Sequence, residues 1–201
     1  MRVSRQTLAA HRSAILDQAS RLFRGRGLDG VGVADITRAA GLTHGAFYGH
    51  FPSKTALAAE ACGRSLLQGA EHWRGRAARA RAAGRDPLAA IIGGYLTERH
   101  RDRPEDGCAL ATLGPEIARA EPPLRAACDD GVTALTQVLE EEIGAARPEL
   151  DDATRVRRAL AVIAALAGGL IIARALAADP ERSRAALESV AAMALRTATE
   201  S

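Results

Sequence analysis

Hydrophobic residues recur at helical spacing along almost the whole chain, and no stretch alternates between apolar and polar residues in the way that indicates a β-strand. In the first such stretch, Ile15, Leu16, Ala19, Leu22 and Phe23 fall on one face of a helix. Cap residues, glycines and prolines divide the remainder into further helices. The sequence therefore predicts an all-α fold of about nine helices.

Length and composition restrict the class of protein further. A chain of 201 residues, 47% of them hydrophobic, is long enough to bury a substantial core and too apolar to stay disordered. Its three cysteines form no CxxC pair, which argues against a disulfide scaffold or a structural zinc site. The first residues contain no apolar segment of a signal peptide, and the longest uncharged apolar run, Ala159–Ala173, is shorter than the ~20 residues of a membrane-spanning helix. We therefore expect a cytoplasmic protein without a membrane partner.

Two short helices are expected in the first quarter of the chain. Gly32 can cap a helix over Val33–Ala40, with Asp35 placed at the third helical position, where a carboxylate meets unpaired amides. After a break at residues 41–43, a second short helix is expected over His44–His50, capped by the hydroxyl of Thr43. Both helices are too short to bury a large face alone.

Longer helices are expected in the rest of the chain. Ser53 caps a helix over residues 54–81, whereas Asp86-Pro87 and Asp179-Pro180 pair a capping carboxylate with a proline at the first helical position. Further helices are expected over residues 122–144, 151–177 and 179–199. The Gly114-Pro115 step is expected to kink or divide a helix over residues 107–120.

Charge is distributed unevenly along the sequence. The chain carries a formal net charge of +3, but residues 1–54 hold eight basic and three acidic side chains, against 19 basic and 21 acidic in the remainder. A small basic segment on a larger, nearly neutral body indicates a head that binds a polyanion. A solvated surface of the same charge fits the count equally well.

The two short helices and the turn between them, which contains Gly41, have helix-turn-helix dimensions. In that motif the second helix lies in the major groove, with its N-terminal residues facing base edges. Residues suited to base contact and then to phosphate contact follow one another here: Thr43, His44, Gly45 and Ala46, then Tyr48, His50 and Lys54. Phe47 and Phe51 are expected to anchor the helix in a small core. The alternative, two packing helices of an ordinary bundle, fits the same spacing.

The stretch GVGVADITRAAGLTHGAFYGHFPSKTALAAEA, Gly30–Ala61, resembles the DNA-binding signature of TetR-type transcriptional regulators. The resemblance implies an N-terminal three-helix helix-turn-helix domain, here residues 1–52, and a C-terminal helical domain for ligand binding and dimerisation, residues 53–201. It also implies that residues 43–46 read bases, and that Tyr48, His50 and Lys54 touch phosphate or support the helix. Gly32 and Gly49 depart from the family pattern, which often has a capping hydroxyl and a second aromatic at these positions.

Large aromatic or imidazole side chains are rare in the C-terminal part of the chain. Trp73, Tyr95 and His100 are candidates for the lining of a ligand cavity, although ordinary core or surface positions explain them as well. Cys108 follows Gly107 near an expected helix start, where the helix dipole activates a thiol. A sensor cysteine and a small buried apolar residue are both open for Cys108.

Three other patterns were tested against the sequence. Gly25–Gly30 matches GxGxxG, but a helix precedes it and no strand follows, so nucleotide binding is not expected. His44 and His50 are six residues apart, without the spacing of a helical metal pair. No catalytic triad, HExxH or P-loop occurs. We expect no catalytic residues, no metal and no cofactor.

The helix over Ala159–Ala173 is so uniformly apolar that it must be buried nearly all round, and its Gly168-Gly169 pair favours close helix approach. Pairing of the last two helices with their copies in a homodimer would bury it; the core helix of a monomer is the alternative. Together with the resemblance to TetR-type regulators, this predicts a homodimeric repressor that binds a palindromic double-stranded DNA operator and is released by a small-molecule inducer. The competing hypotheses are a helical ligand-binding or enzymatic bundle that no longer binds DNA, and a dimerising scaffold.

Overall fold

The computed structural model describes residues 4–200, which form ten α-helices, one 3-10 turn and no strand. The elements are α1 (Arg5–Arg26), α2 (Val33–Ala39), α3 (His44–Phe47), α4 (Lys54–Ala82), α5 (Pro87–Tyr95), α6 (Glu98–Asp102), η1 (Pro104–Asp106), α7 (Ala109–Ala118), α8 (Pro122–Ala146), α9 (Asp152–Ala175) and α10 (Pro180–Thr199). The all-α fold of about nine helices is confirmed. The helix that periodicity did not reveal is α6, whose five residues are mostly polar.

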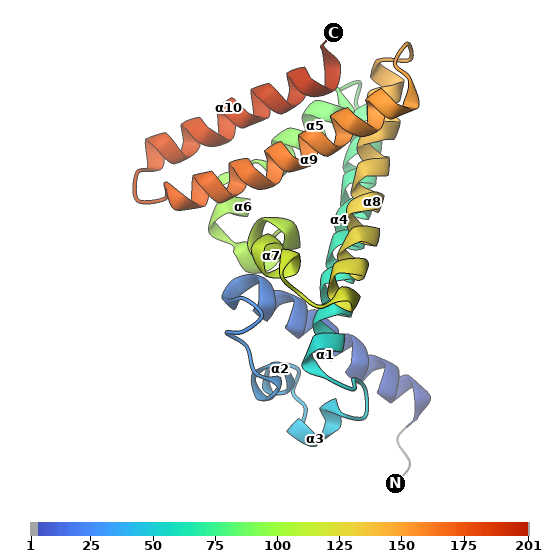
Figure 1. Cartoon of the computed structure of the whole chain (residues 1–201), viewed down its shortest axis with the longest axis vertical. Helices are drawn as coiled ribbons and strands as arrows, with labels where there is room; N and C mark the ends of the chain where they lie inside the picture. Colours follow the sequence, from blue (N-terminus) through green and yellow to red (C-terminus); the bar gives the residue numbers. More distant parts are fainter. Residues whose placement is uncertain (1–3, 201) are drawn as a thin grey trace.

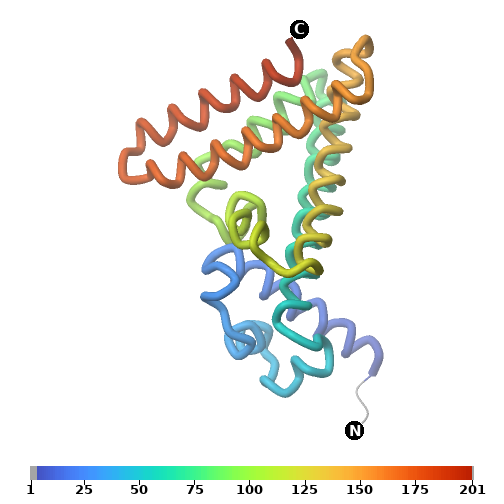
Figure 2. The backbone as a smooth tube through the Cα atoms, in the orientation of Figure 1, coloured from blue at the N-terminus to red at the C-terminus, as the bar shows by residue number. Residues whose placement is uncertain are grey.

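The helices form a small head and a larger body. Helices α1, α2 and α3 cluster at the lower end of the molecule in Figure 1, and α4 runs from this cluster into the body, side by side with α8. Helices α9 and α10 lie along each other across the top, with α5 behind them and with α6 and α7 between them and the head. The chain starts at the head and ends at the far end of the body, as the tube in Figure 2 shows.

The core of the head is built on aromatic side chains. Phe23, Phe47 and Phe51 are buried together with Ile15 and Ile36. The rings of Phe47 and Phe51 lie 5.9 Å apart, which confirms that they anchor α3 and the turn after it. This core fixes the orientation of α3 relative to α1 and α2.

Close backbone contact joins α4 to α8. A Cβ atom added at Gly131 would lie 2.4 Å from the Cβ atom of Leu66, and one added at Gly63 would lie 3.0 Å from the carbonyl oxygen of Ala127. Because only glycine lacks a Cβ atom, these two positions let the helices approach more closely than other residues would allow. Helix α4 is thereby held to the body along its length, while its first turn belongs to the head.

The ends of the helices follow the capping rules in most places. The hydroxyl of Ser53 accepts a hydrogen bond from the N–H of Ala56 at 3.0 Å, and the carboxylates of Asp86 and Asp179 accept from backbone amides of their own helices. Helix α1 ends before Gly27, whose φ of 77° is left-handed. These cap predictions are confirmed.

Two details of the local predictions were wrong, and a third was narrowed. Helix α3 ends at Phe47 instead of His50, and residues 48–50 form a turn in which the amides of His50 and Phe51 bond back to the carbonyl oxygen of Phe47. The residue before α3, Thr43, has extended backbone geometry, but its hydroxyl caps nothing. Of the two outcomes expected at the Gly114-Pro115 step, a kink or a division, the division does not occur, because α7 continues through it. Burial of both Phe47 and Phe51 favours a turn between them, and α3 is shorter for this reason.

Helix α9 alone is long and apolar enough, by length and composition, to cross a membrane among the described helices. It packs instead against α10, α8, α7 and α6 with one face. A Cβ atom at Gly169 would lie 2.7 Å from a methyl group of Val190, so this glycine permits the close approach of α9 to α10 within one chain. Gly168 faces open space. Within a single chain α9 is therefore half-covered, and the expectation of burial nearly all round is not met by its own chain.

Candidate DNA-binding surface and ligand cavity

The turn between α2 and α3 depends on one glycine. Gly41 has a φ of 69°, in the left-handed region that side chains disfavour, and no atom lies within 4 Å of a Cβ atom built on it. The N–H of Leu42 bonds back to the carbonyl oxygen of Thr37 at 2.8 Å and closes the turn. The turn thereby sets α3 across the end of α2.

The start of α3 is open to solvent. Thr43, His44 and Gly45 are exposed, and Ala46 is half-buried. Within residues 4–200 the Thr43 hydroxyl has no hydrogen-bond partner, because it does not cap the helix. No atom lies within 4 Å of a Cβ atom added at Gly45. This surface can therefore meet another molecule without first breaking contacts of its own.

The residues after α3 differ in how far they reach the surface. The side chain of Tyr48 is 62% exposed, and its ring makes edge contacts with the rings of His44 and Phe47, at 5.7 and 5.1 Å. These ring contacts hold the Tyr48 hydroxyl at the rim of the exposed surface. Lys54 lies half-buried in the first turn of α4.

The side chain of His50 lies beside α1 of the head. Its ring lies 6.3 Å from the ring of His11, edge-on. Burial, then the neighbouring His11 and Arg12, lower the pKa of His50 below its ordinary value of 6.5. At neutral pH His50 can therefore offer a hydrogen bond to a phosphate, but no charge.

A cavity of about 520 Å³ lies in the body beside the head. Helices α4 and α5 form one side, and residues 97–108, with α6 and η1, form another. The structure brings all four candidate ligand residues to this one cavity: Trp73, Tyr95, His100 and Cys108. These four residues come from four different elements and lie up to 35 positions apart in the sequence.

The aromatic residues of the cavity form a connected group. The ring of Tyr95 lies edge-on to Trp73 at 5.9 Å and to His100 at 4.5 Å. The Nδ1 atom of His100 lies 2.8 Å from the carbonyl oxygen of Tyr95, and its Nε2 atom accepts the backbone N–H of Cys108 at 2.9 Å. The ring is therefore the neutral tautomer protonated at Nδ1. Burial lowers the pKa of His100 and raises that of Tyr95, which keeps both uncharged at neutral pH.

Cys108 occupies the N-cap position of α7, where the sequence places it, and is half-buried in the cavity wall. Gly107 beside it makes room for His100, because a Cβ atom there would lie 2.6 Å from the imidazole ring. The backbone of Cys108 therefore serves to hold the imidazole. Whether its thiol also senses electrophiles stays a hypothesis.

Four arginines line the cavity, Arg24, Arg76, Arg99 and Arg103, and none of them was foreseen from the sequence. Arg24 lies at the end of α1, where it looks like an ordinary basic residue of the helix C-terminus. Arg76 begins a stretch rich in alanine and arginine that is typical of a solvated helix face. No local sequence pattern marks Arg76 as a cavity residue, because the glycine that makes room for it, Gly94, belongs to the next helix.

Arg24 links the head to the cavity. Its Nε and Nη2 atoms donate to the carbonyl oxygen of Glu105 at 3.0 and 2.7 Å, and Nη1 donates to the hydroxyls of Ser65 and Ser20. Burial lowers the pKa of its guanidinium. A second link follows nearby, where the carboxylate of Glu116 in α7 accepts the N–H of Leu28 at 2.7 Å. The end of α1 is thus bonded to the same segment that lines the cavity.

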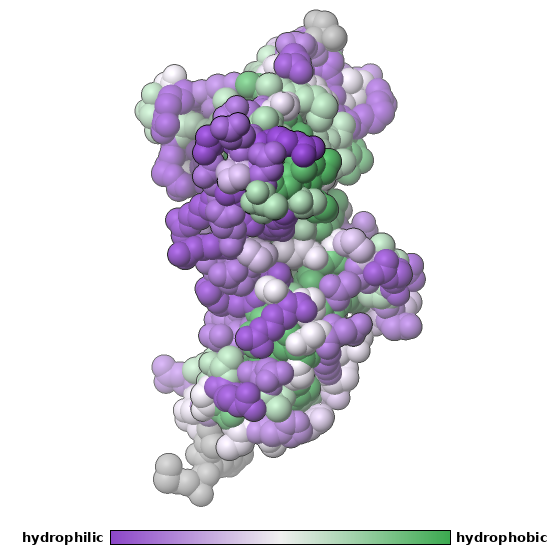
Figure 3. Space-filling model, turned by 90° about the vertical axis from the view of Figure 1, so that its left-hand side faces the viewer, coloured by the Kyte–Doolittle hydropathy of each residue, from purple (hydrophilic) through white to green (hydrophobic). Residues whose placement is uncertain are grey.

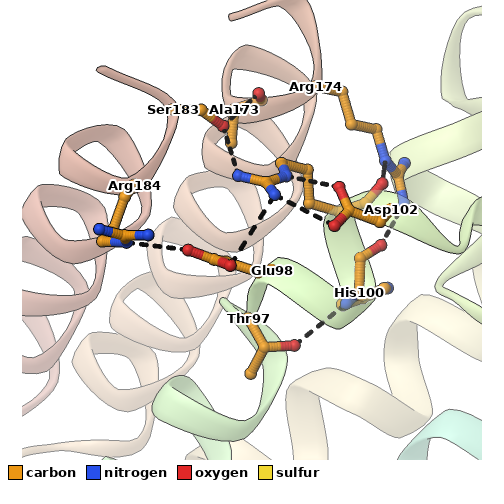
Figure 4. Close-up of polar contacts among 9 residues, drawn as sticks. Thr97, Glu98, His100, Asp102, Ala173, Arg174, Ser183 and Arg184 are labelled. Carbon is orange, nitrogen blue, oxygen red and sulfur yellow. Dashed lines mark hydrogen bonds and ion pairs between the residues drawn. The ribbon is translucent and has the colours of Figure 1, made fainter. Parts of the chain in front are cut away.

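Helix α6 is bonded to the last two helices, as Figure 4 shows. Arg174 of α9 donates to the carbonyl oxygens of His100 and Arg101, at 2.8 and 3.1 Å, and to that of Ala111. Arg101 donates to the hydroxyl of Ser183, which in turn donates to the carbonyl oxygen of Ala173 at 2.7 Å. The cavity wall is therefore attached on one side to the head and on the other to α9 and α10.

Comparisons with known proteins agree with this architecture. Residues 15–61 match the profile of the family described as bacterial regulatory proteins, tetR family, and residues 86–196 match that described as transcriptional regulator LmrA/YxaF-like, C-terminal domain. The HTH-type transcriptional regulator AcrR of Shigella flexneri is 41% identical over 59 residues, which span 29% of this chain and 27% of that protein's length.

Solved structures extend the similarity to the whole fold. A TetR transcriptional regulator from Chloroflexus aurantiacus is 27% identical, with a TM-score of 0.71 over 95% of this chain and 96% of that one. A TetR transcriptional regulator from Legionella pneumophila has a TM-score of 0.76 at 18% identity and covers 98% of this chain and 99% of its own. Together with the two family profiles, these matches show that the chain belongs to the TetR family of transcriptional regulators, which are DNA-binding and ligand-binding proteins and not enzymes.

Proposed function

We propose that this protein is a repressor that binds a near-palindromic operator as a homodimer and leaves it when a small-molecule inducer binds in the body. The observation that carries the DNA-binding part is the exposed start of α3, with the uncommitted Thr43 hydroxyl beside His44 and Gly45. In helix-turn-helix proteins, residues at this place face base edges. We assign base contact to residues 43–46.

Three further residues are assigned to phosphate contact or to support of α3. Tyr48 presents its hydroxyl at the rim, Lys54 carries a charge beside the first amides of α4, and His50 can donate one hydrogen bond. We place the domain boundary at residues 52 and 53, so that residues 1–52 bind DNA and residues 53–201 bind ligand and dimerise. A protein that acts on an operator works in the cytoplasm, which is the location we assign.

The dimer is supported by the uncovered face of α9. Leu160, Ala161, Ala164, Ile171 and Ile172 are all exposed and follow one another at helical spacing. Figure 3 shows hydrophobic residues gathered in this upper part of the molecule, beside a strongly hydrophilic area. A continuous apolar stripe of this kind marks an interaction site. A second copy of the chain, pairing α9 and α10 with their equivalents, would cover it.

A dimer also determines the symmetry and the half-site spacing of the operator. Two copies of α3 related by a two-fold axis read the same sequence on opposite strands, so the half-sites form a near-palindrome about one helical turn or somewhat more apart. An inducer that binds better to a conformation with wrongly spaced heads weakens DNA binding by its differential affinity for the two states. The bonds of Arg24 and Glu116 between α1 and the cavity segment are the proposed route of this coupling.

Retardation of DNA from upstream of the protein's own gene tests the proposal. Lys54→Ala should weaken binding to all sequences alike and make the slope of log K against log salt shallower by about one unit, because one phosphate contact is lost. Substitution of Thr43 or His44 should instead change which bases are preferred.

Two results would contradict these assignments. A Lys54→Ala protein with an unchanged salt slope and altered base preference would reverse the roles of the two groups of residues. Absence of any retardation at low ionic strength would favour the alternative, a helical ligand-binding bundle whose head no longer binds DNA.

A further inference from the structure

The wall of the cavity carries an excess of positive charge. Its lining includes the arginines Arg24, Arg76, Arg99 and Arg103, whereas its one carboxylate is that of Asp106. That carboxylate lies 2.7 Å from the guanidinium of Arg21, outside the lining, and 4.0 Å from that of Arg103. The single acid of the cavity is therefore engaged by other cations, and the field inside the cavity favours an anion.

Arg76 is the clearest unsatisfied charge. Within residues 4–200 its side chain has no hydrogen bond and no ion pair, although it is half-buried. Its guanidinium lies against the backbone of Gly94, where an added Cβ atom would fall 1.0 Å from Nη1. Gly94 thus leaves a place on α5 that the guanidinium fills, at the wall of the cavity. An anionic ligand in the cavity would supply the charged partner that Arg76 lacks within the described residues.

Arg24 adds to the same field from the opposite end of the wall. Its hydrogen-bond partners are a carbonyl oxygen and two serine hydroxyls, all uncharged. These hydrogen bonds stabilise the charge of Arg24, but none of the partners carries a negative charge that would neutralise it. Arg99, which is exposed at the opening, has no carboxylate partner within the described part of the chain. Like-charge repulsion from these groups disfavours a cationic ligand.

The apolar part of the lining limits the ligand further. The edge-on rings of Trp73 and Tyr95, together with Leu66 and Leu135, provide an apolar surface beside the arginines. A volume of about 520 Å³ lies within the range of pockets for small organic molecules and is far larger than an inorganic anion needs. His100 remains neutral and contributes shape instead of charge.

We propose that the cavity binds a small organic anion, with a carboxylate or similarly charged group on Arg76 and an apolar part against Trp73 and Tyr95. This inference rests on the proposed function, because it names the chemical class of the inducer. It assigns Arg76 the role of direct charge partner and Gly94 the role of making room for it.

A matched pair of probes tests the charge requirement. 2-Naphthoate and 2-naphthamide have the same flat ring system and nearly the same shape, but only the first is an anion. Their affinities for the DNA-free full chain are measured by isothermal titration calorimetry. Because Trp73 is the only tryptophan of the chain and lines the cavity, a saturable change in its fluorescence reports binding at this place. We expect 2-naphthoate to bind about tenfold or more tightly than 2-naphthamide.

Two variants locate the charge. Arg76→Gln should weaken 2-naphthoate binding about tenfold and leave 2-naphthamide binding unchanged. Arg74→Gln removes the same charge from the same helix, outside the cavity, and should change neither affinity. Equal affinities of the two probes for the unmodified protein, no effect of Arg76→Gln, an equal effect of Arg74→Gln, or no binding of 2-naphthoate at millimolar concentration would each overturn the proposal.

The outcome is separable from that of the proposed function. Probe binding is measured without DNA, whereas DNA retardation is measured without the probe. A protein that binds DNA but prefers the neutral probe keeps the proposed function and loses the anionic ligand. A protein that binds 2-naphthoate through Arg76 but retards no DNA keeps the ligand class and loses the repressor.

Discussion

Gly45 presents bare backbone at the exposed start of α3. No atom lies within 4 Å of a Cβ atom added there, and its backbone does not have the positive φ that favours glycine. The fold therefore has no need of a glycine at this position. We expect Gly45→Ala to raise the free energy of unfolding by up to about 1 kcal/mol, because alanine is the better helix former. The same methyl group should weaken operator binding about tenfold or more, by crowding the DNA.

Chemical denaturation and fluorescence anisotropy with a labelled operator separate the two effects. Gly93→Ala is the matched control, because Gly93 is also exposed within a helix, has no neighbour within 4 Å of its added Cβ atom and lies in the body. It should stabilise the protein without changing DNA affinity. Full operator affinity in Gly45→Ala would show that the backbone of α3 stays away from the bases.

Protonation of His100 is expected to lower the free energy of unfolding as the pH falls. Burial lowers its pKa in the folded protein below the ordinary 6.5, so the unfolded chain binds a proton more readily than the folded one. The stabilisation by neutral His100 is complete above pH 6.5 and is lost as the pH falls below 6.5 towards the folded pKa. We expect the free energy of unfolding to decrease on acidification in this window, and less steeply in His100→Gln.

Urea denaturation at a series of pH values measures this slope. His50, whose pKa is also lowered by burial, contributes with the same sign and remains in both proteins, so the comparison isolates His100. An NMR titration of the His100 ring provides a direct check. Identical pH slopes for the two proteins, or a His100 pKa above 6.5, would refute a neutral imidazole that is hydrogen-bonded at both ring nitrogens.

At the scale of the element, α6 is stabilised from outside itself. Its five residues contain no buried side chain, and its last carbonyl groups are satisfied by the guanidinium of Arg174. Lysine at position 174 keeps the charge but loses the planar fork that reaches several carbonyl oxygens at once. We expect Arg174→Lys to lower the free energy of unfolding by about 1–3 kcal/mol, because acceptors inside the body lose their donors.

Denaturation at one fixed protein concentration measures this loss, since the proposed dimer would make apparent stability depend on concentration. Arg184→Lys is the control: Arg184 pairs with Glu98 of the same α6 at 2.8 Å, but both side chains are exposed. It should leave stability nearly unchanged. Equal effects of the two substitutions would mean that α6 does not depend on Arg174.

The length of α3 shows where local patterns stop being sufficient. The residues 44–50 have acceptable helical spacing, which is why a helix to His50 was predicted, but the buried rings of Phe47 and Phe51 favour a turn at residues 48–50. The starts of α4, α5 and α10 were predicted nearly to the residue, because caps depend on neighbours two or three positions away. Tertiary packing decides the ends only where a helix is short.

At the scale of the whole molecule, the apolar stripe on α9 predicts the oligomeric state. The side chain of Ile172 is 54% exposed in a single chain. If a second copy covers it, Ile172→Arg places an unpaired charge in an apolar interface and should abolish the dimer at micromolar concentration. Operator affinity should fall with it, because one head alone makes half of the contacts.

Analytical ultracentrifugation gives the oligomeric state directly. Leu67→Arg is the control, because Leu67 is an equally exposed hydrophobic residue, at 48%, on α4 and away from the stripe. It should leave the dimer intact. A monomeric unmodified protein, or an Ile172→Arg protein that still sediments as a dimer, would remove α9 from the interface.

The sequence by itself determined the all-α fold, most helix ends and the position of the helix-turn-helix, because periodicity, caps and turns are interactions between residues a few positions apart. Only the tertiary structure decided that Trp73, Tyr95, His100 and Cys108 surround one cavity. It alone also placed Arg24 and Arg76 in the same wall. Gly94 on another helix makes room for Arg76, and Arg24 lies there because α1 ends beside the cavity. A cavity and its charge arise where distant segments fail to fill the space between them, and no local pattern in a chain records that space.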